Sequence, residues 1–234
     1  MKNYIILIAF MAILFTSCKT SEEIIFKKDF SGQMITNIDY KQTLEMMKAM
    51  SAQKNEKMPE DSLKMVIDQM LSKVKESYEP VKSIKGISNF KMDMNNDDSY
   101  KISFNFTDVA ALNQAYNKLL NANKSMNEEK MMPDNDNKVE TKTATAPLYN
   151  YFTLKSKELT YSRPKEEGNA NNEGQMGEIS KMMEYNLKIS FENRKIKKIT
   201  NENKLDLKTD ENSVNFSPSV ETLQKGLSFK IKLK

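Results

Sequence analysis

Side chains that could carry nucleophilic or acid–base chemistry are few in this chain of 234 residues. Histidine, whose proton comes off near neutral pH, is absent, so the usual catalytic triads and dyads of hydrolases cannot form. Serine with lysine remains, because Ser51 with Lys54 and Ser72 with Lys75 fit the S-x-x-K spacing that one class of serine enzymes uses. No K-T-G segment accompanies them, and such spacings arise easily in a lysine-rich chain. We therefore predict that the protein is not an enzyme.

Methionine is the most abundant soft metal ligand, with 17 residues. Thioethers can hold Cu(I), and Met92 and Met94, two residues apart on an expected strand, would point to the same face. These two, like Met47, Met50 and Met70, also fall where the periodicity requires an apolar residue, and filling a core is an ordinary role of methionine. We interpret the methionines as core residues and predict no cofactor.

Oxygen ligands at alternate positions suggest a second kind of metal site, a calcium-binding loop. They are Asp93, Asn95, Asp97 and Ser99. In such a loop the sixth residue is glycine and the twelfth is glutamate, whereas this chain has Asp98 and Phe104 there. We interpret the segment as a polar hairpin turn and predict no metal site.

The only cysteine, Cys18, comes directly after the first hydrophobic run of the chain. Lys2 precedes an apolar run from Tyr4 to Phe15. As a helix, these roughly 12 residues reach about 18 Å, well short of the ~30 Å hydrocarbon core of a bilayer. A positive start, a short apolar core and small residues such as Ser17 are typical of a secretory signal peptide.

Residues 2–18 resemble the lipobox of bacterial lipoproteins. In that family the cysteine sulfur receives a diacylglyceryl group, the peptide is cut just before the cysteine, and the new amine is acylated, for example by palmitate. The resemblance implies that Cys18 is lipidated and that the bond between Ser17 and Cys18 is cleaved. Three acyl chains form a firm anchor, because each buried methylene adds about 0.8 kcal/mol. The expected first partner is therefore a membrane.

The residues after Cys18 bear on the location. Lipoproteins with Asp at the next position stay in the inner membrane, so Lys19 implies the outer membrane, with a periplasmic or a surface-facing domain. Ser21-Glu22-Glu23 resembles the acidic export tag of Bacteroidota lipoproteins. The alternative is that Glu22 and Glu23 form the polar start of the first strand. The formal net charge of +4 is near neutral for the size, so no nucleic acid partner is predicted.

Alternation of apolar and polar residues predicts half-buried strands at residues 100–106, 187–192 and 227–234. Strands with one wet face favour antiparallel pairing. Hairpins are predicted around residues 28–32, 95–98 and 209–212, where turn residues separate alternating runs. We expect an α+β fold with largely antiparallel sheets, one face of which is solvated, packed by two or three helices.

Helical spacing of apolar residues is clearest from Glu60 to Tyr78, and Pro80 is expected to end this helix. A second helix is predicted after Thr107 or Asp108, either of which can cap it, and its apolar face runs to Leu120. A weaker pattern covers residues 43–54.

Two polar stretches, residues 121–147 and 164–177, cannot bury enough apolar surface to offset their chain entropy and are predicted to be surface loops. The expected division is a signal peptide at 1–17, a lipidated tether at 18–22, an α+β lobe at 23–122, a flexible linker or long loop at 123–147, and a mostly β lobe at 148–234. Alternatively, the two lobes form one domain.

The solvated faces of the predicted strands are basic. If those strands are neighbours, they form a shallow basic surface that could meet a protein or glycan partner. The residues are Lys101, Ser103, Asn105, Lys188, Ser190, Lys230, Lys232 and Lys234. The alternative is a solvated face that guards against aggregation.

Two functions fit these observations. The first is an envelope lipoprotein that acts as a non-enzymatic binding or structural module. The second is a carrier or chaperone-like lipoprotein that holds an apolar or anionic ligand between a sheet and its helices. A deep apolar pocket beneath the helix from Glu60 would favour the carrier, and a filled core would favour the module.

Overall fold

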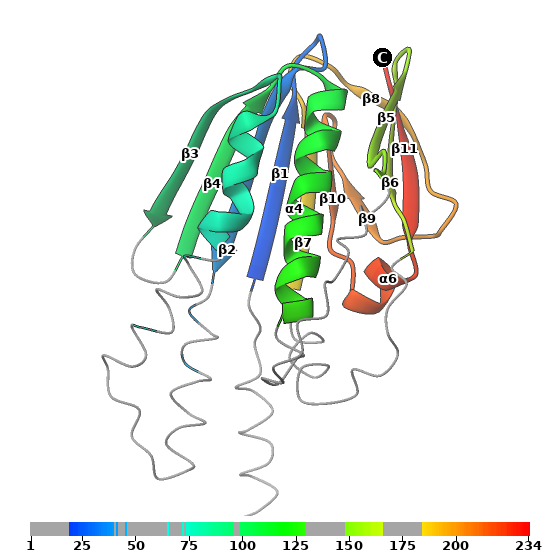
Figure 1. The fold of residues 1–234 in the computed structure, drawn as a ribbon. Helices are drawn as coiled ribbons and strands as arrows, with labels where there is room; N and C mark the ends of the chain where they lie inside the picture. Colours follow the sequence, from blue (N-terminus) through cyan, green and yellow to red (C-terminus); the bar gives the residue numbers. More distant parts are fainter. Residues whose placement is uncertain are drawn as a thin grey trace, which may run out of the picture.

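The computed structural model describes residues 19–39, 74–95, 99–129, 148–165 and 184–234, together with the single residues 41, 45, 65 and 72. Two sheets and a long helix form the body of the protein (Figure 1). The predicted α+β class, with its largely antiparallel sheets, is confirmed.

Seven strands form the larger sheet, sheet A, in the order β3-β4-β2-β1-β7-β10-β9. They are β1 (Lys19–Phe26), β2 (Gly32–Asp39), β3 (Ile87–Asn95), β4 (Ser99–Phe106), β7 (Glu184–Phe191), β9 (Leu207–Thr209) and β10 (Ser213–Phe216). The three predicted hairpins are confirmed as β1–β2, β3–β4 and β9–β10. One pair departs from the antiparallel prediction, because β1 and β7 run parallel. Parallel neighbours need a long crossover connection, and here most of the chain lies between them.

Four antiparallel strands form sheet B, in the order β5-β6-β11-β8. They are β5 (Phe152–Lys155), β6 (Glu158–Arg163), β8 (Ile196–Thr200) and β11 (Leu227–Leu233). The predicted strand at 227–234 is confirmed as β11. The alternation analysis missed β5, β6 and β8, which have four, six and five residues, so the pattern in each is short.

The long helix, α4 (Val109–Glu129), confirms the predicted helix and its cap, because the Asp108 carboxylate accepts a hydrogen bond from the Ala111 amide at 2.8 Å. The helix runs further than predicted: residues 121–129, expected to be loop, are helical. Extending an existing helix costs far less than starting one, so a polar sequence of moderate propensity can continue it.

Two other helical elements have described bounds, η1 (Glu79–Ser83) and α6 (Val220–Gln224). Residues 74–78 are helical and lead into η1, where Pro80 lies in the first turn, as expected for the end of the predicted helix. Most of the rest of that helix, and of the weaker one at 43–54, lies outside the described residues.

Sheet A and sheet B pack through one continuous hydrophobic core. Aromatic rings connect the two sheets. The ring centroid of Phe26 in β1 lies 6.1 Å from that of Phe152 in β5, and the Phe152 centroid lies 5.1 Å from that of Tyr161 in β6. Sheet A itself contains strands from both sides of the expected linker at 123–147. The two expected lobes therefore share a sheet and a core. The ligand pocket that would favour a carrier was expected beneath a helix that lies largely outside the described residues.

Candidate functional site

Ser17 and Cys18, the predicted cleavage and lipidation residues, lie just outside the described part of the chain. The next residue, Lys19, is already the first residue of β1. It pairs with Asp39 of β2 and Glu184 of β7, and we call this end of sheet A the anchor edge. Residues 19–22 of the expected tether at 18–22 belong to this strand.

Strand β1 is central in sheet A, and all eight of its residues have partners on both sides. Of the two interpretations of Ser21-Glu22-Glu23, a short acidic export tag or the polar start of the first strand, the structure shows that these residues belong to the strand. Because successive side chains alternate between the faces of a strand, Glu22 lies on the same face as the buried Ile24 and Phe26. An acid on the core face requires polar partners.

Two tyrosines supply those partners. The hydroxyl of Tyr116, from α4, donates to Oε2 of Glu22 at 2.6 Å. The hydroxyl of Tyr185, from β7, donates to the same oxygen at 2.7 Å. Hydrogen bonds to an ionised acceptor are among the stronger ones in proteins. The carboxylate therefore joins β1 to the helix that covers sheet A and to the neighbouring strand.

Tyr78 and Tyr161 complete a group around Glu22 that we call the tyrosine cluster: Tyr78, Tyr116, Tyr161 and Tyr185. Burial raises the pKa of all four hydroxyls above the ordinary value, and the charge of Glu22 raises each pKa further. The cluster therefore stays neutral, and able to donate hydrogen bonds, at any physiological pH. No pattern in one segment predicts it, since its members come from four distant parts of the chain.

The basic surface predicted from the strands is divided in the structure. Strand β4, with Lys101, is separated from β7 by β2 and β1, and β11 lies in the other sheet. On β7, the Lys188 ammonium lies 2.8 Å from the Glu23 carboxylate of the neighbouring strand and is paired with it. The condition that these strands be neighbours is therefore not met. Only the lysines of β11 belong to a strongly basic region.

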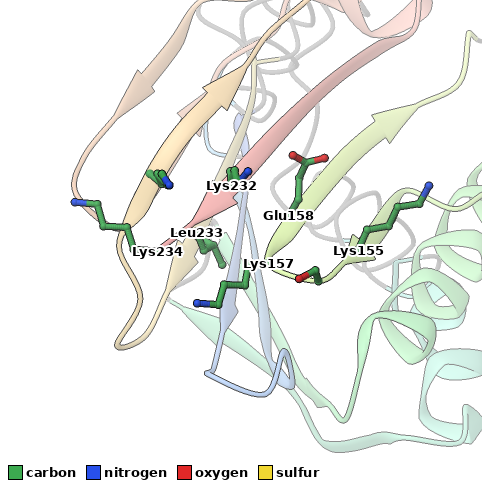
Figure 2. A pocket seen from close by; sticks show the side chains of 8 residues that line it. Lys155, Lys157, Glu158, Lys232, Leu233 and Lys234 are labelled. Carbon is green, nitrogen blue, oxygen red and sulfur yellow. The ribbon is translucent and has the colours of Figure 1, made fainter.

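That region surrounds a pocket of about 400 Å³ at one end of sheet B (Figures 1 and 2). This end lies on the side of the molecule away from the anchor edge of sheet A. We call it the lysine pocket. Its lining residues are Lys155, Ser156, Lys157, Glu158, Lys197, Lys232, Leu233 and Lys234. Figure 2 shows Lys232, Glu158 and Lys155 extending from three different strands, with Leu233 turned to the other side of the sheet.

A second pocket of about 460 Å³ lies between α4 and β5, and asparagines line it. Asn113 donates to the Phe152 carbonyl at 2.7 Å and accepts from the Phe152 amide at 2.8 Å. Asn117 makes the same pair of bonds with Tyr149. Both amides are thus used to fasten the segment before β5 to the helix, which is a structural role.

The remaining sequence candidates are placed as follows. Ser72 donates to the Glu76 carboxylate at 3.1 Å, and Ser51 and Lys54 lie outside the described residues. Asp93 and Ser99 belong to β3 and β4, and Asp97 between them is not described. Within the described ranges, no three acidic side chains come together in a way that could hold a metal ion. The same ranges contain no helix with the length and hydrophobicity needed to cross a bilayer.

Comparison with known proteins gives little. No protein family matches the chain, and no curated protein shows significant sequence similarity to it. Among solved structures, the chain is similar to the folded domain of the LppM protein of Mycobacterium tuberculosis, with 10% sequence identity and a TM-score of 0.43. That similarity covers 93% of this chain and 90% of the LppM domain.

Proposed function

We propose that the protein is an envelope lipoprotein, held on the outer membrane by acyl chains on Cys18, and that its folded domain is a non-enzymatic binding or structural module. The short apolar leader that ends at a single cysteine supports the anchor. The observation that carries the proposal is that Lys19, the residue after that cysteine, already belongs to β1.

An anchor attached at this point is joined to the centre of the fold. Strand β1 has sheet partners on both sides, and Glu22 fastens it to the tyrosine cluster. A pull on the lipid is therefore resisted by the whole sheet rather than by a terminal strand that can peel away. Such an attachment suits a module that must stay in a fixed position on a surface.

The position of Lys19 in β1, next to Cys18 in the sequence, also orients the domain. The anchor edge faces the bilayer, and the turn between β1 and β2 lies at the far end of the molecule (Figure 1). Seven steps of about 3.4 Å place the two ends of β1 about 24 Å apart. The lysine pocket shares the far end with that turn, so it faces away from the membrane that holds the protein.

Metabolic labelling with a palmitate analogue tests this function in cells of a lipoprotein-processing bacterium. The wild-type chain should carry the label and sediment with membranes, and Cys18→Ala should lose both properties. Ser21→Ala, three residues further on, is the matched control and should keep both. An unlabelled wild type, or a labelled Cys18→Ala variant, would contradict the proposal.

A further inference from the structure

We infer that the outer face of sheet B, centred on the lysine pocket, binds an anionic glycan: a linear sugar polymer that carries carboxylate or sulfate groups. The inference concerns residues that the anchor does not involve. Five lysines and a single glutamate line the pocket, which leaves a clear excess of positive charge. A ligand that balances this charge must be an anion with several negative groups.

Strand register arranges these charges in a row. Lys232 of β11 lies opposite Glu158 of β6 on one side and opposite Lys198 of β8 on the other. Glu158 in turn lies opposite Lys155 of β5. Residues directly opposite each other in an antiparallel sheet project from the same face, so the row crosses all four strands. Neighbouring positions in it are spaced by the distance between strands, about 4.8 Å.

The row contains a feature that costs stability. Lys198 and Lys232 are cross-strand partners of the same charge, and such pairs are destabilising. Next to them is a bulge: Lys232 pairs with Lys198 and Leu233 pairs with Ile196, so Lys197 is an extra residue of β8 between the two pairs. The bulge thus adds a further ammonium group to the pocket. An anion that bridges these lysines would relieve their repulsion.

Nearby lysines outside the pocket are paired with acidic side chains. Lys195, just before β8, is paired with Glu211, and Lys225 lies 2.6 Å from Glu221. The pocket lysines differ, because within the described chain none of them has a carboxylate within 4.0 Å. Glu158 is the only acid in the lining, and Glu211, which is paired with Lys195, also attracts Lys234 electrostatically from outside it.

A second row of side chains, two residues further along the strands on the same face, favours a sugar polymer as the ligand. Lys230 lies between Thr160 of β6 and Thr200 of β8, and Thr153 of β5 lies beyond Thr160. Hydroxyl groups that both donate and accept hydrogen bonds, set beside a row of ammonium groups, match a chain of hydroxyls and carboxylates. Both rows lack aromatic side chains, on which nucleic acid bases would stack. An anionic glycan is therefore the partner that the chemistry of this face favours.

The test uses the full chain in nonionic detergent and measures binding of a short oligogalacturonate by calorimetry, at low and at physiological salt. A maltodextrin of equal length is the neutral control. Polyglutamate, single-stranded DNA and vesicles with phosphatidylglycerol are tested in parallel. The pocket variant is Lys197→Gln with Lys232→Gln. The matched control is Lys91→Gln with Lys118→Gln, two exposed lysines on β3 and α4.

An ammonium group near an anionic surface contributes about fivefold in affinity, so the pocket variant should bind oligogalacturonate about 25-fold more weakly. The control variant should bind like the wild type, and a Lys197→Arg, Lys232→Arg chain should retain binding. Unchanged binding by a pocket variant with wild-type thermal unfolding would overturn the inference. So would equal binding of maltodextrin, or tighter binding of any of the three other polyanions.

This result and the test of the anchor are separable. A chain that is not lipidated but binds the glycan contradicts only the proposed anchor. A lipidated chain that does not bind it contradicts only the inference drawn from sheet B.

Discussion

Replacing Glu22 by alanine tests how the first strand is held in the domain. The change removes the acceptor of two hydrogen bonds, from Tyr116 at 2.6 Å and from Tyr185 at 2.7 Å. A hydrogen bond to a charged group contributes about 1.5 to 3 kcal/mol, so the gross loss is about 3 to 6 kcal/mol. The variant no longer buries part of a carboxylate, which offsets some of this loss. We expect a net destabilisation of about 3 kcal/mol.

Glu23→Ala is the matched control, because Glu23 is the next residue but lies on the outer face. Its partner Lys188 is 2.8 Å away, and the side chains of the pair remain 33% and 43% exposed. Solvent screens such a pair, so its loss should cost at most about 1 kcal/mol. The two glutamates therefore differ in environment while sharing a strand and a side chain.

Urea unfolding of the purified chains measures both effects. A double-mutant cycle of Glu22→Ala with Tyr116→Phe isolates the bond between them, and its coupling energy should be about 1.5 to 3 kcal/mol. The reasoning is refuted if Glu22→Ala costs no more than Glu23→Ala, or if the effects of the two substitutions in the cycle are additive.

Three further predictions concern the tyrosine cluster, the asparagines and the orientation. The pKa of each cluster tyrosine is raised in the folded state above the ordinary 10.0. The contribution of each tyrosine to the free energy of unfolding is therefore complete below pH 10, and above pH 10 it falls by about 1.4 kcal/mol per pH unit. Tyrosinate absorbance should therefore rise together with unfolding, and a gradual rise in a folded chain would count against the cluster. Asn113→Ala leaves the buried amide and carbonyl of Phe152 without partners and should cost about 2 to 4 kcal/mol in urea unfolding, whereas a loss below about 1 kcal/mol would show that Asn113 is not the fastener. In vesicles with lipid-borne acceptors, energy transfer should be stronger from a dye on Glu184→Cys than on Lys28→Cys, and equal transfer from both would exclude the proposed orientation.

Local patterns were enough to predict much of the fold. The alternation at 100–106 and 227–234 identifies strands because each has one buried and one solvated face. Asp108 marks the start of α4 because a carboxylate there can satisfy a free amide. The order of the strands could not be predicted, since it depends on contacts between distant segments. This is why the lysines of β4, β7 and β11 do not form one surface.

At the candidate site, the sequence leaves two interpretations of Glu22 open, an acidic export tag and the polar start of the first strand, and the structure places it in the strand. Its position has the same parity as Ile24 and Phe26, a signal that places its side chain on the core face of the strand. Acidic residues after a lipidated cysteine also resemble an export tag, so the sequence alone does not decide between the two. The tyrosines that make a core-facing acid tolerable lie far away in the sequence, so the sequence does not reveal their arrangement. The lysine pocket was missed for a similar reason, because β5 and β8, which bring Lys155 and Lys197, are short strands.

Mass spectrometry of the N-terminal fragment of the mature protein tests the proposed anchor most directly. The account predicts a fragment that begins at Cys18 and carries acyl chains on its sulfur and its amine. A fragment that begins at Met1, or one with an unmodified Cys18, would contradict it.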